Sequence, residues 1–99
     1  MDSKTKNVTF GDQVEIICTT PLQHGVEWEF AGNGSMTICT GITVHHAGDK
    51  YECKGETHRH TLIIKDVNFD DAGVYTCIDK EGRAMTRDSM RLRVIGSCK

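Results

Sequence analysis

Long apolar runs and a surplus of one charge are both missing from this chain of 99 residues. Lysine and arginine number 12 against 14 acidic residues, and the formal net charge is −2. The charged residues are mixed along the chain, which excludes the basic footprint of a protein that binds nucleic acid or an acidic membrane surface. No apolar run approaches the roughly 20 residues that span a bilayer. We therefore expect no nucleic-acid partner and no direct membrane insertion by this domain.

A secretory leader is not visible either. The start, residues 1–4, lacks the apolar stretch of a signal peptide. Two interpretations follow: a cytosolic protein, or a piece of a longer chain. We expect the second.

Catalytic constellations are also not apparent. His58 and His60 fall on one face of an expected strand, but no serine, cysteine or acid is spaced to form a triad with them. No glycine-rich phosphate loop is visible. We expect these histidines to lie on an exposed sheet face, and we expect no enzymatic activity, no cofactor and no metal.

Alternating apolar residues are what the chain does contain. Cys18 closes an alternating run that begins at Val14, and Trp28 lies in a second such run. This period of two is typical of half-buried strands, so the chain is expected to be all-β. The length suits one domain, 1–99, with a core of about 4–95 and a tail of 96–99.

A spaced set of residues between positions 14 and 77 carries a family resemblance. The set is Cys18, Trp28, Leu62-x-Ile64 and Asp71-x-Gly73-x-Tyr75-x-Cys77. It resembles the immunoglobulin superfamily, of the variable-like or intermediate-set kind. The resemblance implies a Greek-key sandwich of two antiparallel sheets, joined by a Cys18–Cys77 disulfide against Trp28, with Tyr75 as the corner tyrosine.

The strands implied by this fold can be placed along the sequence. They are expected at 4–10, 13–20, 26–30, 35–40, 50–54, 58–66, 73–79 and 83–95. Residues 41–49 lose the period, so an irregular edge strand or a loop is expected there. Asp88 would face inward if the last strand were regular, which predicts a bulge near residues 87–89. Lys50 could pair with Asp71, as in variable-type domains, or be solvated.

Three further cysteines remain after the central pair: Cys39, Cys53 and Cys98. Cys39 and Cys53 fall on strands that meet at the edge of the sandwich in this family, which favours a second disulfide. Two alternatives stay open: reduced thiols, or a zinc site completed by His45 or His46. Cys98 has no assigned role.

The outward residues of one sheet suggest a binding face. With Trp28 and Cys77 inward, strands 26–30, 73–79, 83–95 and 35–40, called C, F, G and C′ in this family, would form an apolar centre between acids and arginines. The expected members are Glu27, Glu29, Ile38, Thr76, Ile78, Arg91 and Arg93. Such a face is self-complementary under a two-fold axis. Scattered surface apolar residues are also ordinary.

Two function hypotheses follow from the resemblance. The first is an extracellular recognition or adhesion module of a cell-surface receptor, which binds another protein, a second copy included, through this face or the end loops. Sequons at Asn7 and Asn33 favour a secreted glycoprotein. The second is a cytosolic intermediate-set domain of a titin-like or obscurin-like muscle scaffold.

Overall fold

The computed structural model describes residues 4–19, 26–32, 34–46, 48–56, 59–79 and 86–96. These residues form nine strands and one short 3₁₀ helix. In chain order they are β1 Lys4–Thr9, β2 Val14–Thr19, β3 Glu27–Ala31, β4 Ser35–Thr40, β5 Thr43–Val44, β6 Tyr51–Gly55, β7 Arg59–Ile64, η1 Phe69–Asp71, β8 Gly73–Asp79 and β9 Thr86–Ile95.

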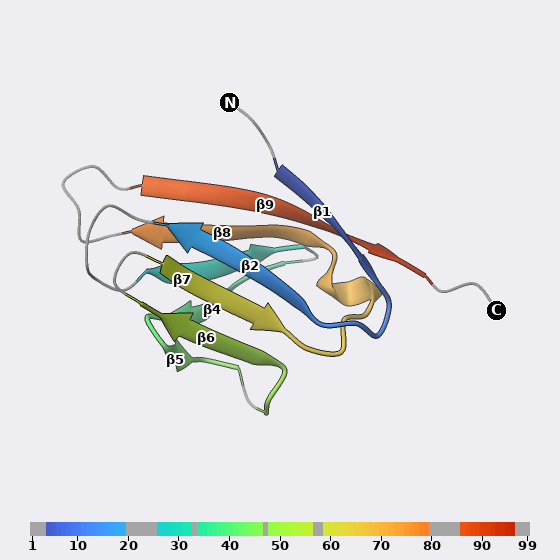
Figure 1. Cartoon of the computed structure of the whole chain (residues 1–99), viewed down its shortest axis with the longest axis horizontal. Coiled ribbons are helices and arrows are strands. Elements are labelled where there is room, and N and C mark those ends of the chain that lie inside the picture. The colour runs from blue at the N-terminus through green and yellow to red at the C-terminus, as the bar shows by residue number, and fades with distance from the viewer. Residues whose placement is uncertain are drawn as a thin grey trace.

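The strands form two layers (Figure 1). One sheet has the order β1-β9-β8-β3-β4-β5, and the other has the order β2-β7-β6. In the view of Figure 1 the three-stranded sheet lies in front of the six-stranded one. β1 pairs with β9 in parallel, whereas the neighbours within the rest of both sheets are antiparallel. The expected all-β sandwich is confirmed, and residues 43–44 supply the short edge strand that was one interpretation of the aperiodic segment.

The core lies between the sheets because the strands alternate. β2 shows the pattern most clearly: Val14, Ile16 and Cys18 are buried, while the residues between them are exposed. β7 contributes Leu62 and Ile64, both fully buried, on the same phase. An alternating strand has one face for the core and one for solvent.

The predicted bulge in the last strand is wrong. β8 and β9 pair without a register shift from Gly73↔Leu92 to Asp79↔Thr86. Asp88 lies opposite Cys77, on the inward phase, yet it is exposed. Asp88 lines the small cavity beside the Cys18–Cys77 disulfide, and β2, which carries Cys18, is the last strand of its sheet. The irregularity lies elsewhere, between Trp28 and Glu29 where β3 pairs with β4.

Within the described residues, no helix has the length and the apolar character needed to cross a membrane.

Candidate binding face

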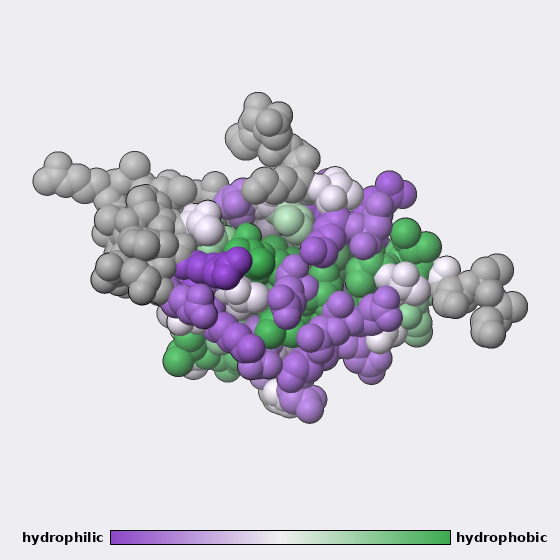
Figure 2. Space-filling model, viewed as in Figure 1, coloured by the Kyte–Doolittle hydropathy of each residue, from purple (hydrophilic) through white to green (hydrophobic). Residues whose placement is uncertain are grey.

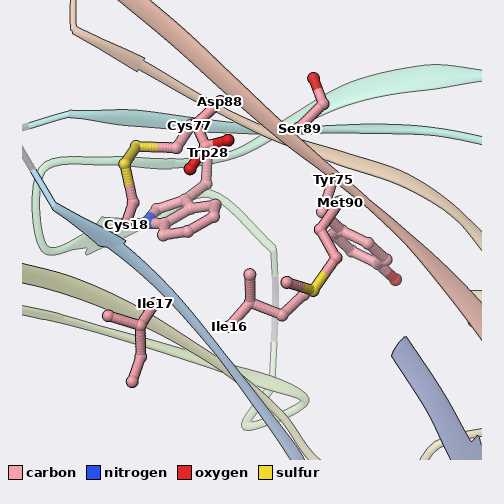
Figure 3. A pocket seen from close by; sticks show the side chains of 9 residues that line it. All are labelled: Ile16, Ile17, Cys18, Trp28, Tyr75, Cys77, Asp88, Ser89 and Met90. Atoms are coloured by element: carbon pink, nitrogen blue, oxygen red, sulfur yellow. A yellow bond between two sulfur atoms is a disulfide. The ribbon is translucent and has the colours of Figure 1, made fainter. Parts of the chain in front are cut away.

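The centre of the sandwich is cross-linked by Cys18 and Cys77, whose Cα atoms are 6.4 Å apart. Trp28 lies beside this disulfide with 1% of its surface exposed (Figure 3). In the sheet, Trp28 pairs with Cys77 of β8 on one side and with Cys39 of β4 on the other. The predicted disulfide and its tryptophan are confirmed.

Tyr75 holds the approach to β8 by a hydrogen bond. Its hydroxyl donates to the backbone carbonyl of Asp71 at 2.7 Å, and its side chain is fully buried. Burial, with smaller contributions from Tyr51 and Asp71, raises the pKa of Tyr75 well above its usual value. The pKa of Tyr51 is raised for the same reasons, burial first and then Asp71. Tyr75 therefore has the predicted corner-tyrosine geometry.

Gly73 is required by a close approach of backbone. It has a φ of +154°, and a Cβ at this position would lie 2.5 Å from the carbonyl oxygen of Ala31. An L side chain would both strain this backbone conformation and clash with β3. The glycine of the Asp71-x-Gly73 pattern thus lets β8 begin directly against β3.

Lys50 is not solvated but paired. Its ammonium lies 2.7 Å from Oδ2 of Asp71 and also donates to the carbonyl of Asp66 at 3.1 Å. The same carboxylate oxygen accepts the backbone N–H of Asn68, in a capping box on η1. Asp71 is only 5% exposed. Its buried carboxylate is stabilised by two donors, the ammonium of Lys50 and the backbone N–H of Asn68. The Lys50–Asp71 pairing suggested by the resemblance is confirmed.

The second disulfide, Cys39–Cys53, joins β4 to β6 with a Cα separation of 6.7 Å. Both sulfurs are therefore consumed, which removes the alternatives of reduced thiols and a zinc site. The two candidate zinc histidines have other neighbours: the Nε2 atom of His45 lies 2.7 Å from the hydroxyl of Thr40, and the ring of His46 packs edge-on against Tyr51.

The outer face of the six-stranded sheet brings most of the predicted binding residues together. Val74 and Thr76 of β8 lie at its middle, half-buried. Thr76 pairs with Glu29 of β3 on one side and with Ser89 of β9 on the other, and the hydroxyls of Thr76 and Ser89 are 3.1 Å apart. Ser89 was missed in the sequence because a serine in a strand gives no distinctive signal.

Charges of opposite sign lie on either side of this middle. Glu29 and Glu27 are half-exposed on β3. On the other side of β8, Arg91 of β9 is exposed and lies opposite Val74. Arg93 follows two residues later on the same face and is also exposed. We name the set Glu27, Glu29, Val74, Thr76, Arg91 and Arg93 the CFG face. The acids lie toward one end of the sheet and the arginines toward the other.

Two residues predicted for this face are not available on it. Ile78 is 1% exposed although its phase is outward, so the folded chain covers it on the outer side of β8. Ile38 is fully buried in the core cluster. It is the extra residue of β4 at the bulge between the Trp28↔Cys39 and Glu29↔Thr37 pairs, which turns it inward beside Cys39.

His60 was also expected to be exposed, and this prediction is wrong. It pairs with Cys18 and with Gly55, shares the inward phase of Leu62, and is 6% exposed. The alternation already visible in Leu62 and Ile64 would have placed it inward. His58 lies outside the described residues.

The opposite face of the sandwich differs in how its charges are used. Hydrophilic residues run across the three-stranded sheet (Figure 2). The carboxylate of Glu52 on β6 forms two ion pairs: its Oε1 lies 3.6 Å from Nζ of Lys65, and its Oε2 lies 3.9 Å from Nζ of Lys54. Ile63 is 4% exposed between Glu15 and Glu52. Ion pairs within the chain thus compensate charges on this face, whereas in the described part of the chain Glu29, Arg91 and Arg93 enter none.

Two hollows among the described residues were candidates for a small-molecule site, and neither has the enclosed apolar form of one. The one beside the central disulfide is lined by Trp28, Tyr75 and Met90, among others, and its volume is about 10 Å³, far below the several hundred Å³ of a ligand pocket (Figure 3). A larger hollow beside Lys50 is open and lined by glycine and polar residues only. Among the described residues, no group of three metal-ligating side chains comes together.

The first sequon is placed by the structure and the second is not. Asn7 lies on β1, exposed and opposite Arg93. Asn33 lies outside the described residues.

Comparison with known proteins agrees with this architecture. The crystal structure of the ZIG-8 IG1 homodimer superposes with a TM-score of 0.80 at 19% identity, over 96% of this chain and 81% of that one. The crystal structure of the ZIG-8–RIG-5 IG1–IG1 heterodimer gives a TM-score of 0.80 at 15% identity, over 95% and 83% of the two chains. At these identities the likeness shows the fold. The sequence profile of the immunoglobulin I-set domain matches residues 2–94, so the chain belongs to this family.

Proposed function

We propose that this domain is an extracellular recognition module that binds another protein through the CFG face, and that a second copy of the same chain is a partner. The observation that carries the proposal is the separation of charge on this face: Glu29 and Arg91 lie on opposite sides of Val74 and Thr76, and neither is used in an ion pair among the described residues.

A two-fold axis across the middle of the CFG face would bring Arg91 and Arg93 of each copy toward Glu29 and Glu27 of the other. Opposed charges of this kind steer association and set register, while the half-buried Val74 and Thr76 would supply a drier centre. Two structural neighbours are a homodimer and a heterodimer of IG1 domains, which supports a protein partner for a chain of this fold.

Two disulfides in one small domain support an oxidising compartment. They weigh against the cytosolic muscle-scaffold hypothesis, which requires reduced thiols. Alkylation of the native protein before and after reduction tests this part. Free thiols at Cys39 and Cys53 in freshly isolated protein would contradict it.

A charge swap tests the face itself. Arg91→Glu would place like charges opposite each other in both halves of a symmetric pair, and sedimentation equilibrium should show self-association weakened by about tenfold or more. Adding Glu29→Arg to the same chain should restore association, because both opposed pairs are then reversed together. Arg59→Glu, an exposed arginine on β7 of the other sheet, makes the same change in net charge and should have no effect.

The outcome that would overturn homophilic binding is equally definite. It is a wild-type domain that stays monomeric at high concentration, or an Arg91→Glu variant that associates as well as the Arg59→Glu control.

A further inference from the structure

β1 forms an outer edge of the six-stranded sheet. Among the described strands it pairs only with β9, from Lys4↔Met90 to Thr9↔Ile95. The other side of an edge strand presents unpaired backbone N–H and C=O groups, which can add a strand from a second molecule. The six-residue edge of β1 could therefore pair with a strand of a second molecule, and this association would compete with binding through the CFG face.

The sequon Asn7-Val8-Thr9 lies on this edge strand. Val8 is 8% exposed and pairs with Val94 on the core side. Alternation turns Asn7 and Thr9 to the opposite side, and both are exposed. Asn7 pairs with Arg93, so its side chain lies on the same outer face as the arginines, one strand beyond them. The acceptor amide and the hydroxyl of the sequon are thus both open to solvent.

We propose that Asn7 carries an N-linked glycan, and that this glycan closes the β1 edge to strand addition while leaving the middle of the CFG face open. The inference rests on the extracellular part of the proposed function, since the donor, a lipid-linked oligosaccharide diphosphate, belongs to the secretory route. The amide nitrogen of Asn7 bonds to the anomeric carbon of the sugar, the bond from that carbon to the diphosphate breaks, and one amide proton is lost.

The position of Asn7 decides what the glycan can block. A bulky, hydrated group that rises from the outer face at the middle of β1 overhangs this edge, and it would crowd the side chains of any incoming strand. Glu29, Thr76 and Val74 lie two or three strands away from β1, across β9. The glycan would therefore lie at the border of the CFG face beside Arg93, and it would leave Val74 and Thr76 at the middle of that face uncovered.

Glycosylation of Asn7 can be tested on the whole chain, expressed in animal cells with a cleavable secretion signal and purified from the medium. Treatment with an amidase that removes N-glycans should lower the mass and convert Asn7 to aspartate, which peptide mass spectrometry reads. Thr9→Ala should abolish the glycan on Asn7, whereas Thr9→Ser should retain it. Ser35→Ala removes the second sequon and isolates the first.

The two failures can be told apart. If the chain is secreted with both disulfides formed and Asn7 remains unmodified, the glycan inference is wrong and the proposed function stands. If the secreted chain contains free thiols at Cys39 and Cys53, the extracellular proposal itself fails, and the glycan inference fails with it.

The blocking role needs a separate measurement on the secreted protein. The Thr9→Ala protein should form higher-order species by sedimentation velocity that Arg91→Glu does not remove, because they use the β1 edge and not the CFG face. The Thr9→Ser protein should lack them. Identical sedimentation of the Thr9→Ala and Thr9→Ser proteins would overturn the role of the glycan at the edge.

Discussion

The centre of the sandwich and its β4–β6 edge are both cross-linked by sulfur, but the two links differ in what surrounds them. Cys77 and Cys39 lie on either side of Trp28 in the six-stranded sheet, and their partners Cys18 and Cys53 lie on the two outer strands of the other sheet. The central link joins residues 59 apart in sequence, and the edge link joins residues 14 apart.

The difference separates global from local stabilisation. In the chain-entropy account, closing a loop of about 60 residues stabilises a fold by roughly 4 kcal/mol, and a loop of about 15 residues by roughly 3 kcal/mol. The edge link encloses β5, a two-residue strand that, among the described strands, pairs only with β4. Both links join the two sheets, but the edge link also fastens a segment with little pairing of its own, whereas the central link joins the sheets at the core beside Trp28.

Loss of the central disulfide should have the largest effect. The Cys18→Ala/Cys77→Ala variant should lose about 4 kcal/mol in its free energy of unfolding, measured by urea denaturation. That is a large part of the total for a small domain, so the variant should unfold near physiological temperature. A loss smaller than that of the edge variant would reverse the comparison.

The edge disulfide should contribute less to stability and open sooner. Cys39→Ala/Cys53→Ala should cost about 3 kcal/mol. All four sulfurs are buried, so reduction requires local opening, which is easiest at edges with few hydrogen bonds. Timed reduction and alkylation with mass spectrometry should show Cys39 and Cys53 labelled first. Simultaneous labelling of both pairs would show that the edge opens only with the whole domain.

The Lys50–Asp71 pair connects the edge to the centre, because Lys50 immediately precedes β6 and Asp71 immediately precedes the turn into β8. Lys50→Met should cost about 2 kcal/mol, since it removes a charged donor from a carboxylate that is nearly buried. Lys65→Met is the matched control. It breaks the more exposed pair with Glu52 and should cost no more than about 0.5 kcal/mol. Equal losses would mean that burial of Asp71 adds nothing.

The hydroxyl of Tyr75 should have the smallest effect. Tyr75→Phe removes its hydrogen bond to the Asp71 carbonyl and should cost about 1 kcal/mol at neutral pH. The folded state raises the pKa of Tyr75, so the native protein holds this proton more tightly than the unfolded chain, whose tyrosines titrate near about 10.

The contribution of Tyr75 to stability is therefore complete below about pH 10 and is lost as the pH rises above that value. The midpoint temperature of thermal unfolding should fall above about pH 10 in the wild type, and it should fall less in Tyr75→Phe. Parallel pH curves for the two proteins would rule out Tyr75 as a source of the decline.

Much of the fold could be predicted because its signals are local. Cys18 and Trp28 each stand in an alternating run, and the Asp71-x-Gly73-x-Tyr75-x-Cys77 spacing encodes the corner hydrogen bond, the close approach of β8 to β3 and the disulfide. The Cys39–Cys53 pairing followed from the family resemblance, since spacing alone left reduced thiols and zinc open.

The binding face could be predicted only in part, because exposure depends on neighbours in other strands. Alternation correctly turned Glu29 and Arg91 outward, and it put Ile78 on the right side of β8. It could not show that Ile78 is covered there, or that a bulge turns Ile38 into the core. The exposure of Ile42, at 70%, fell in the segment without a period and had no sequence signal.

The sequence by itself determined which residues face the core along the regular strands, and it marked the centre by Cys18, Cys77 and Trp28, because side-chain direction alternates with position along an unbroken strand. The tertiary structure alone decided where the strands slip against each other and which outward residues are covered. It also decided that, among the described residues, Glu52, Lys54 and Lys65 form ion pairs while Glu29, Arg91 and Arg93 do not. These properties depend on distances between residues far apart in the chain, which no local pattern records.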